Sequence, residues 1–391
     1  MEAIELIEIA GRGEDSRHQF KQDISNPDSL AADVVAFSNC DGGEILIGVN
    51  DQGQVVGLSS DDIRRLNQLI SNVATNLVHP PISPITENIS VGEKLVMVVT
   101  VRPGISKPYA DNKGAYWMKS GADKRRVTSR EEIRRMFQNA DLVYADEIPV
   151  GGASISDISR EHFAAFFQKR FESSLDLTLD QSGFSITQLL GNLGLARGET
   201  PNLAGLLTFG RRPQRFRPDL VVKAVAFVGN SDTGNRYRDS QDLEGCLNEL
   251  YRGTMSFVLR NLRRVQGDRG INTEGELEIP PSALEEMLVN MLLHRDYFIS
   301  APWRVMIFDN RVEIISPGTL PNSLTVENIR GGVSVIRNPL IASFATKADE
   351  LPYRGLGTGI RRALELVPSL ELKSDKDRNL FIATIPRTQQ G

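Results

Sequence analysis

Cysteine is nearly absent from this chain, since Cys40 and Cys246 are its only 2 cysteines among 391 residues. Two distant cysteines exclude a disulfide framework and a cysteine-rich zinc site, and they indicate a reducing compartment. No apolar stretch approaches the roughly 20 residues that are needed to span a bilayer. The opening residues, MEAIELIEIA, are acidic and carry no basic leader. We therefore expect a cytoplasmic protein with no membrane partner.

Positive charge is not in excess. The chain has 45 Lys and Arg against 50 Asp and Glu, and its formal net charge is −5. A protein that binds nucleic acid over its whole surface is usually basic, so any nucleic-acid contact here must come from a local patch. The sequence also lacks a GxxxxGK[ST] phosphate-binding loop. A helicase motor built on that loop is therefore excluded.

The length and the apolar periodicity predict an α/β (α+β) protein with more than one domain. Residues 1–145 alternate helical and strand-like segments and are expected to form one domain. Residues 276–391 are expected to form another, with the hairpin RVMIF and RVEII and two closing strands, LELKS and LFIATIP. Residues 146–275 are expected to be a connector that contains helices and the strand LVVKAVAFVG.

The C-terminal segment carries the clearest chemical pattern. A helix is expected to begin at Pro281 with Ser282 as its N-cap, and it places Glu286, Asn290 and His294 on one face. In front of a nucleotide, an Asn oxygen suits Mg²⁺ and a Glu can polarise a water molecule. The glycines of GLGTGI would let the backbone approach a phosphate at a helix start. Taken singly, the polar stripe also fits a solvated helix face, and the glycines also fit ordinary turns.

The motifs EEMLVNMLLHRDYF, RVEIISPGTLPNSLT, IRNP and GLGTGIRRALE resemble the degenerate GHKL-type ATPase domain of bacterial proteins described as RecG-related helicases or transcriptional regulators. The resemblance implies an α/β sandwich that binds ATP with Mg²⁺. It implies that Glu286 is the catalytic residue of the N box, that Asn290 holds the metal and cofactor, and that His294 contacts the cofactor.

The resemblance also implies two glycine boxes that bind the cofactor. The first contains Gly318, and the second contains Gly355, Gly357 and Gly359. Residues 319–354 would form the lid, from which Arg337 or Lys347 could reach phosphate. The first glycine box normally carries an Asp that binds adenine, whereas Ser316 stands in the corresponding loop.

The N-terminal motifs GEDSRHQFKQD, VVAFSNCDGGEILIGVNDQGQVVGL and KPYADNKGAYWMKSGADKRRVTSREEI resemble the Schlafen AlbA-type domain. In relatives that cut RNA, three carboxylates are thought to hold Mn²⁺ or Mg²⁺. By this resemblance Glu14 is the first carboxylate and Asp51 the third, both as catalytic metal ligands, but Gln19 replaces the second. The same residues are also consistent with purely structural roles, because Asp51 belongs to an ordinary hairpin-turn sequence and Glu14 can be a solvated charge.

A basic stretch with interleaved aromatics follows in residues 107–135. Its candidate nucleic-acid contacts are Lys107, Lys119, Lys124, Arg125, Arg126 and Trp117. Cations and aromatic rings together suit phosphate contact and base stacking. A solvated loop with its aromatics packed inward fits the composition equally well, but the Schlafen resemblance favours binding.

Together these patterns favour an ATP-binding regulator that contacts DNA or RNA through its N-terminal domain. The alternative is a metal-dependent Schlafen-like nuclease that cuts RNA, tRNA or DNA, for example in host defence, and the second alternative is a non-catalytic scaffold in which both sites have decayed. The chain could thus be a weak ATPase or a nuclease. AlbA-type modules resemble dimer-forming ones, so we also expect a homo-oligomer.

Overall fold

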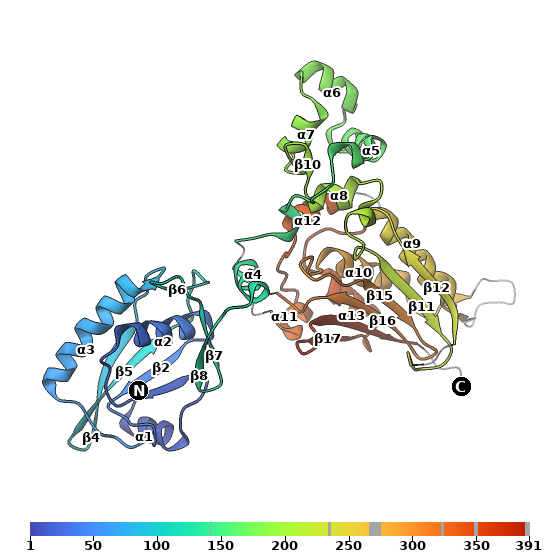
Figure 1. The fold of residues 1–391 in the computed structure, drawn as a ribbon. Helices are drawn as coiled ribbons and strands as arrows, with labels where there is room; N and C mark the ends of the chain where they lie inside the picture. Colours follow the sequence, from blue (N-terminus) through green and yellow to red (C-terminus); the bar gives the residue numbers. More distant parts are fainter. Residues whose placement is uncertain (141, 234–235, 266–274, 322–323, 348–350, 388–391) are drawn as a thin grey trace. The chain divides into compact units, whose positions relative to one another are not determined.

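The computed structural model describes residues 1–140, 142–233, 236–265, 275–321, 324–347 and 351–387. The chain divides into two compact units, Met1–Val143 and Tyr144–Gly391 (Figure 1). Both units mix helices with sheets, as the sequence predicted. Within the described ranges no helix is both long and apolar enough to cross a membrane.

A four-stranded sheet forms the centre of the N-terminal unit. Its strands are β1 (His18–Lys21), β2 (Gly43–Ile47), β4 (Ile85–Val91) and β5 (Lys94–Val101). The order is β1-β2-β5-β4, with β1 parallel to β2 and the other two pairs antiparallel. The remaining elements are α1 (Ala3–Arg12), α2 (Pro27–Asn39), α3 (Ser60–Asn72), the π-helix η1 (Val73–Leu77), β3 (Val78–His79), β6 (Ala110–Asp111), β7 (Trp117–Ser120), β8 (Asp123–Arg126) and α4 (Arg130–Asn139).

Alternation along β2 decides which helix covers which face of this sheet. Ile45 and Ile47 are buried in a cluster with residues of α2 and α3. Leu46, between them, is buried in a second cluster with Leu6 and Ile9 of α1.

The predicted basic loop, residues 107–135, is partly regular. Strands β7 and β8 form a hairpin within it, and this hairpin contacts α2.

A six-stranded sheet is the centre of the C-terminal unit, in the order β12-β11-β15-β16-β18-β17. Its strands are β11 (Val222–Phe227), β12 (Tyr237–Leu243), β15 (Trp303–Ile307), β16 (Arg311–Pro317), β17 (Glu371–Asp375) and β18 (Leu380–Pro386). Only β11 and β15 pair in parallel; the other pairs are antiparallel. The predicted hairpin and the two predicted closing strands are thus β15–β16 and β17–β18.

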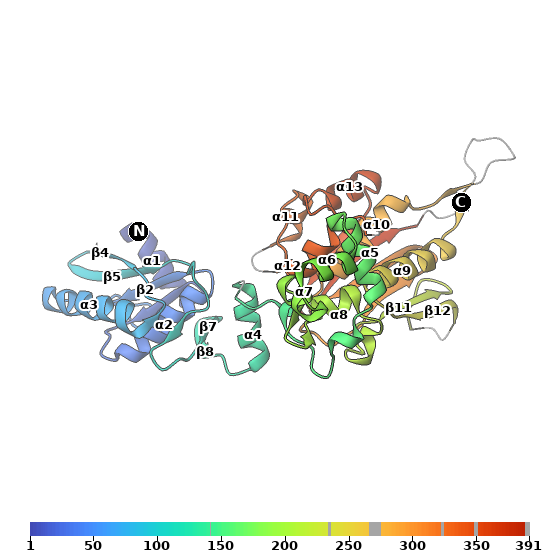
Figure 2. The same cartoon turned by 90° about the horizontal axis from the view of Figure 1, so that it is seen from above.

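Helices line one face of this sheet. The helices of the unit are α5 (Arg160–Phe171), α6 (Leu175–Ser182), α7 (Ile186–Asn192), α8 (Leu203–Phe209), α9 (Leu247–Asn261), α10 (Pro281–Leu293), α11 (Val326–Arg330), α12 (Pro339–Ala345) and α13 (Gly359–Leu366). The central helix α10 packs between α9 and α13 (Figures 1 and 2). Trp303, Val305 and Ile307 of β15 are buried, and the residues between them are partly exposed. This is the pattern of a sheet with one covered face.

Short elements complete the C-terminal unit. They are the 3₁₀ turns η2 (Ala145–Glu147), η3 (Ile155–Asp157) and η4 (Pro213–Arg215), and the two-residue strands β9 (Ala196–Arg197), β10 (Thr200–Pro201), β13 (Arg264–Val265) and β14 (Glu276–Leu277). The described parts of residues 146–275, which were expected to be a connector with helices and a strand, share one apolar core with those of residues 276–391. The reason lies in β11, whose apolar residues Val222 and Ala224 pair with β15 and are fully buried.

The start of α10 also differs from the expectation. Pro280 is the N-cap and makes no side-chain cap hydrogen bond, and Ser282 lies inside the first turn. Proline is favoured in the first helical turn because the N–H that it lacks has no partner there anyway. The helix begins two residues earlier than a Ser282 cap would require, and this leaves the polar stripe in place.

Candidate nucleotide site and the predicted nucleic-acid surface

The polar face of α10 borders a cavity in the C-terminal unit. Glu286, Asn290 and His294 all line it, as their spacing of four residues requires. The opposite face of α10 carries buried apolar residues such as Leu284 and Leu288. One helix therefore anchors itself to the core and presents the stripe to the cavity.

Segments far apart in sequence complete the walls of this cavity. They come from the end of β16, the segment after it, and the glycine-rich segment before α13. The apolar lining includes Met287, Met291, Ile314, Leu320, Leu324, Ile329, Val333, Phe381 and Ala383. The cavity also contains four of the predicted glycines: Gly318, Gly355, Gly357 and Gly359. Seven of the eight predicted C-terminal site residues thus surround one space, Arg337 being the exception.

Two of these glycines allow close approaches that a side chain would block. Gly357 has φ +69°, and an added Cβ would lie 2.7 Å from the carbonyl oxygen of Gly332. At Gly359 an added Cβ would lie 2.0 Å from Oε2 of Glu286. The backbone at the start of α13 therefore touches the carboxylate of α10 directly.

Glu286 and Asn290 already have partners within the unit. The Glu286 carboxylate forms an ion pair with the Arg362 guanidinium of α13, and the Glu286 side chain is 14% exposed. The Asn290 amide donates to the Glu286 backbone carbonyl at 2.6 Å. Because the amide nitrogen is used there, Oδ1 of Asn290 is the atom that can serve as a ligand.

His294 is a neutral residue of the cavity at neutral pH. Burial, with a smaller contribution from the charge of Arg337, lowers the pKa of His294 to about 4. The imidazole meets the Tyr353 ring edge-on, with centroids 6.1 Å apart. Burial and the charge of Glu286 raise the pKa of Tyr353. His294 can therefore contact a ligand through hydrogen bonds but not through a positive charge.

Neither predicted lid cation points into the cavity. Arg337 is buried and donates to the carbonyl oxygen of Thr319 at 2.9 Å. Its Nη1 is 2.8 Å from the Cβ that a side chain at Gly318 would add, so it supports this segment from behind. Lys347 lies over the Phe344 ring, 5.8 Å from its centroid. Parts of the predicted lid, 322–323 and 348–350, lie outside the described residues.

Ser316 lines the cavity at the position where the resemblance would place an aspartate. Its hydroxyl donates to the carbonyl oxygen of Met291 on α10 at 3.1 Å. A hydroxyl oxygen that donates one hydrogen bond keeps its lone pairs as acceptors. Ser316 thus offers a ligand an uncharged acceptor instead of a carboxylate.

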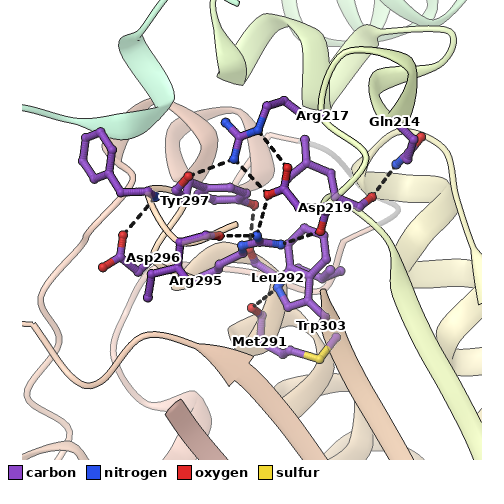
Figure 3. A network of polar contacts seen from close by, with 12 residues as sticks. Gln214, Arg217, Asp219, Met291, Leu292, Arg295, Asp296, Tyr297 and Trp303 are labelled. Atoms are coloured by element: carbon purple, nitrogen blue, oxygen red, sulfur yellow. Dashed lines mark hydrogen bonds and ion pairs between the residues drawn. The ribbon is translucent and has the colours of Figure 1, made fainter. Parts of the chain in front are cut away.

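A buried polar network supports the neighbouring wall (Figure 3). The Asp219 carboxylate binds Arg217 through both oxygens at 2.9 Å and Arg295 at 2.8 Å. Arg295 is fully buried and its guanidinium carbon lies 4.4 Å from the centroid of the Trp303 ring. Burial opposes ionisation of Asp219, but hydrogen bonds and charges from the two arginines hold its pKa below the usual range.

This network joins the segment before β11, strand β15 and the segment after α10, close to Gly318. Asp296 follows Arg295 directly, its backbone N–H donates to Pro317, and its Cβ lies 2.5 Å from the position of an added Gly318 Cβ. No local sequence pattern predicts this network, because Arg217 and Arg295 are far apart along the chain. Arg362 could have been found, since it lies one helical turn beyond Gly359 and therefore near the residues that Gly359 contacts.

In the N-terminal unit, Glu14 is used to hold β1. Its Oε1 accepts from the Gln19 amide at 2.6 Å and from the Phe20 backbone N–H at 2.7 Å. Asp51 is exposed in the turn after β2. In the described part of the chain, no group of three or more His, Cys, Asp and Glu side chains is arranged to hold a metal ion. The three-carboxylate arrangement suggested by the resemblance is therefore not assembled by these residues.

Most of the residues that were predicted to contact phosphate form hydrogen bonds or ion pairs within the domain instead. Lys107 donates to the Cys40 carbonyl at 2.7 Å, and Lys124 pairs with the buried Asp33 at 3.0 Å. Lys119 donates to Gln19 at 2.9 Å, and burial lowers its pKa. These three lysines fasten the loop and the β7–β8 hairpin to the body of the domain.

The three other candidates differ in exposure. Arg125 forms a two-pronged ion pair with Glu132 of α4, and the Trp117 indole donates to Asp111 at 2.9 Å. The Arg126 side chain is exposed and makes no hydrogen bond or ion pair with the described residues, although its charge helps to lower the pKa of Asp111. Of the six, Arg126 is thus the one whose charge is directed to solvent.

Two family models match parts of the chain. The model described as "Schlafen, AlbA_2" matches residues 14–128, and the model described as "Putative ATP-dependent DNA helicase recG C-terminal" matches residues 301–384. The second match includes Gly318 and the glycine-rich segment, but it begins after α10 and so excludes Glu286 and Asn290. A search of curated proteins found no match.

Solved structures also resemble the chain. The DIP2311 protein from Corynebacterium diphtheriae is 19% identical over 99% of this chain and 80% of its own, with a TM-score of 0.47. The N-terminal domain of a "Putative ATP-dependent DNA Helicase RecG-related Protein" from Nitrosomonas europaea is 24% identical over 33% of this chain and 96% of its own, with a TM-score of 0.23. Since both TM-scores are below 0.5, no argument rests on these likenesses.

Proposed function

Since the chain contains a Schlafen AlbA_2 domain and a RecG-related HATPase-like C-terminal domain, we propose that it is an ATP-binding regulator that contacts nucleic acid. The C-terminal cavity would bind the nucleotide, and the N-terminal unit would contact DNA or RNA. One observation carries the proposal: Asn290, Glu286 and the three glycines of the second glycine box all line one cavity.

The cavity offers a suitable group to each part of a nucleotide. Its apolar walls, among them Ile314 and Phe381, can enclose the base. The backbone N–H groups at the start of α13 can face phosphate. Oδ1 of Asn290 is an oxygen ligand of the kind that Mg²⁺ prefers, and the bound ion would neutralise phosphate charge. These residues therefore fit ATP with Mg²⁺.

Base recognition would depend on Ser316. The amino group of adenine donates hydrogen bonds, and the Ser316 hydroxyl oxygen can accept one from it. A neutral acceptor is usually weaker than a carboxylate in this role, because charge-assisted hydrogen bonds are roughly twice as strong. We therefore expect selectivity for adenine over guanine to be modest.

Calorimetric titration of the full chain with ATP and Mg²⁺ tests the nucleotide site. Binding should occur with the wild type and be lost or strongly weakened in Asn290→Ala. The exposed Ser282→Ala, on the same helix but outside this cavity, is the matched control and should bind like the wild type. A wild type that binds no nucleotide would refute the proposal.

The nucleic-acid contact is proposed on the Schlafen match and on the exposure of Arg126. Labelled duplex DNA and single-stranded RNA should both be tested by fluorescence anisotropy across a salt series. Arg126→Ala should weaken binding and reduce the salt slope by about one counterion. The paired Arg125→Ala should have a smaller effect, and equal effects of the two would contradict the assignment. Homo-oligomer formation remains a prediction, which sedimentation velocity would test.

The nuclease alternative remains open to a direct test. Oε1 of Glu14 accepts two internal hydrogen bonds, so a metal ion at this oxygen would have to compete with them. We expect no Mn²⁺-dependent cleavage of structured RNA or DNA beyond that of Glu14→Gln and Asp51→Ala. Cleavage by the wild type that both variants abolish would establish the nuclease instead.

A further inference from the structure

Charge is unevenly distributed around the cavity. The charged side chains that line it, among the residues that the structure describes, are Glu286, Arg354 and Arg362. Glu286 is their one carboxylate, and it pairs with Arg362. Arg354 is exposed and pairs with no acid in the described part of the chain. The cavity therefore holds one more positive than negative charge, and its single acid is bound to one of the two cations.

The Glu286 carboxylate lies where a helix stabilises an anion. Its Oε2 is 2.0 Å from the position of an added Gly359 Cβ, and Gly359 is the first residue of α13. The first turn of α13 contains no acid, and its cap residue Thr358 makes no side-chain cap hydrogen bond. The N-terminal end of a helix carries partial positive charge and unsatisfied N–H groups. The carboxylate of α10 thus supplies the negative charge that α13 lacks.

We propose that Glu286 is an internal substitute for a phosphate group, and that Arg362 and the start of α13 form the subsite for the terminal phosphate of a bound nucleotide. Entry of the phosphate displaces the carboxylate from Arg362. This inference rests on the proposed nucleotide site and adds to it a phosphate-binding arginine and a competing internal anion.

The two members of the ion pair differ in a way that suits this exchange. The Arg362 side chain is 49% exposed, so solvent and ligand can reach it, whereas Glu286 is 14% exposed. A guanidinium presents a planar fork that binds phosphate through two hydrogen bonds, as it does a carboxylate. A partly exposed ion pair is worth about 1 kcal/mol or less, so a phosphate with more charge can replace it.

The exchange also changes the state of Glu286. While it is paired with Arg362, the carboxylate is turned toward α13. Once it is released, it lies one helical turn from Asn290, the proposed ligand of Mg²⁺, and it can accept a hydrogen bond from water there. Phosphate binding would thus free the residue that the N-box resemblance assigns to catalysis.

Titrations of the full chain with three probes test the proposal: ATP with Mg²⁺, adenosine, and inorganic triphosphate. Glu286→Gln keeps the shape of the side chain but removes its charge, so it should bind ATP and triphosphate about 3 to 5 times more tightly. Arg362→Ala should weaken both by about tenfold. Arg362→Lys should recover part of the loss, because it restores charge without the fork. Adenosine should bind equally to all of these proteins.

The outcomes separate this inference from the nucleotide site itself. If the wild type binds ATP and Asn290→Ala does not, but Glu286→Gln binds no more tightly or Arg362→Ala binds equally well, the phosphate subsite is wrong and the nucleotide site stands. Loss of adenosine binding in Arg362→Ala would also overturn the inference, because it would show a structural effect. If the wild type and every variant bind none of the probes, both proposals fail.

Discussion

Replacing Asp146 with asparagine should remove a pH dependence from the stability of the C-terminal unit. Asp146 lies in η2 and is fully buried. Its Oδ2 accepts a hydrogen bond from the backbone N–H of Ile341 in α12 at 2.9 Å, and its Oδ1 has no hydrogen-bond partner. Burial opposes the charged form, and although backbone hydrogen bonds favour it, the pKa of Asp146 is raised to about 6.

The sign and size of the effect follow from this pKa. The folded value of about 6 exceeds the usual 3.8, so the folded protein binds the proton more tightly than the unfolded chain. The resulting stabilisation is complete below pH 3.8 and is lost as the pH rises through 6. At about 1.4 kcal/mol per pH unit the full effect is about 3 kcal/mol, of which about 2 kcal/mol falls between pH 4.5 and pH 7.

His294 should act in the opposite direction. Its pKa is lowered to about 4 from the usual 6.5, so the neutral imidazole is favoured by folding. The stability from this group is present above pH 6.5 and is lost as the pH falls through 4, again by about 2 kcal/mol between pH 7 and pH 4.5. The two effects nearly cancel in the wild type. Only the differences between the wild type and single variants reveal them.

Urea unfolding at pH 4.5, 5.5, 6.5 and 7 provides the assay. Trp117 and Trp303 are the 2 tryptophans of the chain, one in each unit. In a Trp117→Phe background, fluorescence reports on Trp303 and thus on the C-terminal unit. The unfolding free energy of Asp146→Asn minus that of its parent should rise by about 2 kcal/mol from pH 4.5 to pH 7. The same difference for His294→Gln should fall by a similar amount.

A flat difference for Asp146→Asn would refute the reasoning, because the carboxylate would then have the same proton affinity in both states. The predicted change of this difference with pH is also distinct from simple damage to the fold. Loss of a hydrogen bond or a packing defect shifts the free energy by a constant, whereas a titrating group changes it with pH.

Two further predictions concern the fold. Arg295→Leu leaves the Asp219 carboxylate, whose side chain is only 13% exposed, with one cation fewer. It should destabilise the C-terminal unit by about 3 to 5 kcal/mol in the same urea assay; a loss below about 1 kcal/mol would show that Arg217 suffices. Gly53 and Gly114 have matching φ values of +74° and +73°, but an added Cβ at Gly53 lies 2.0 Å from a carbonyl oxygen of α1, while that at Gly114 meets nothing. Gly53→Ala should therefore cost at least about 1 kcal/mol more than Gly114→Ala, which carries only the backbone strain, and equal melting temperatures would contradict the predicted clash.

The elements that the sequence predicted well are those with a strong local signal. The hairpin over residues 303–317 and the closing strands have clear apolar alternation and turn residues, and they form as predicted. Glu286, Asn290 and His294 share the cavity because a helix brings every fourth residue to the same face. These features depend on neighbours that are close in sequence, so a single chain reveals them.

The partners of charged side chains could not be predicted in the same way. Lys124 meets Asp33, and Asp146 meets Ile341, only because the fold brings distant segments together. The role of residues 146–275 was missed for a similar reason. The strand β11 was recognised, but its pairing with β15 joins segments that are separated by about 80 residues, and that distance carries no local pattern.

The charged residues that stand out in the sequence are therefore a poor guide to the surface that meets a ligand. A lysine that already bonds to a buried aspartate must give up that bond to hold a phosphate, and within this fold the exchange gains little. Arg362 is different, because its partner is a carboxylate at the wall of a cavity and its own side chain is half exposed. Exchange there replaces one anion by another at the same cation, and the released Glu286 carboxylate stays at the wall of the cavity. A paired cation at a cavity wall is thus a better candidate for anion binding than a paired cation that fastens a hairpin. For the same reason the N-terminal unit should contact nucleic acid through Arg126, whose charge faces solvent, before it does so through Lys124.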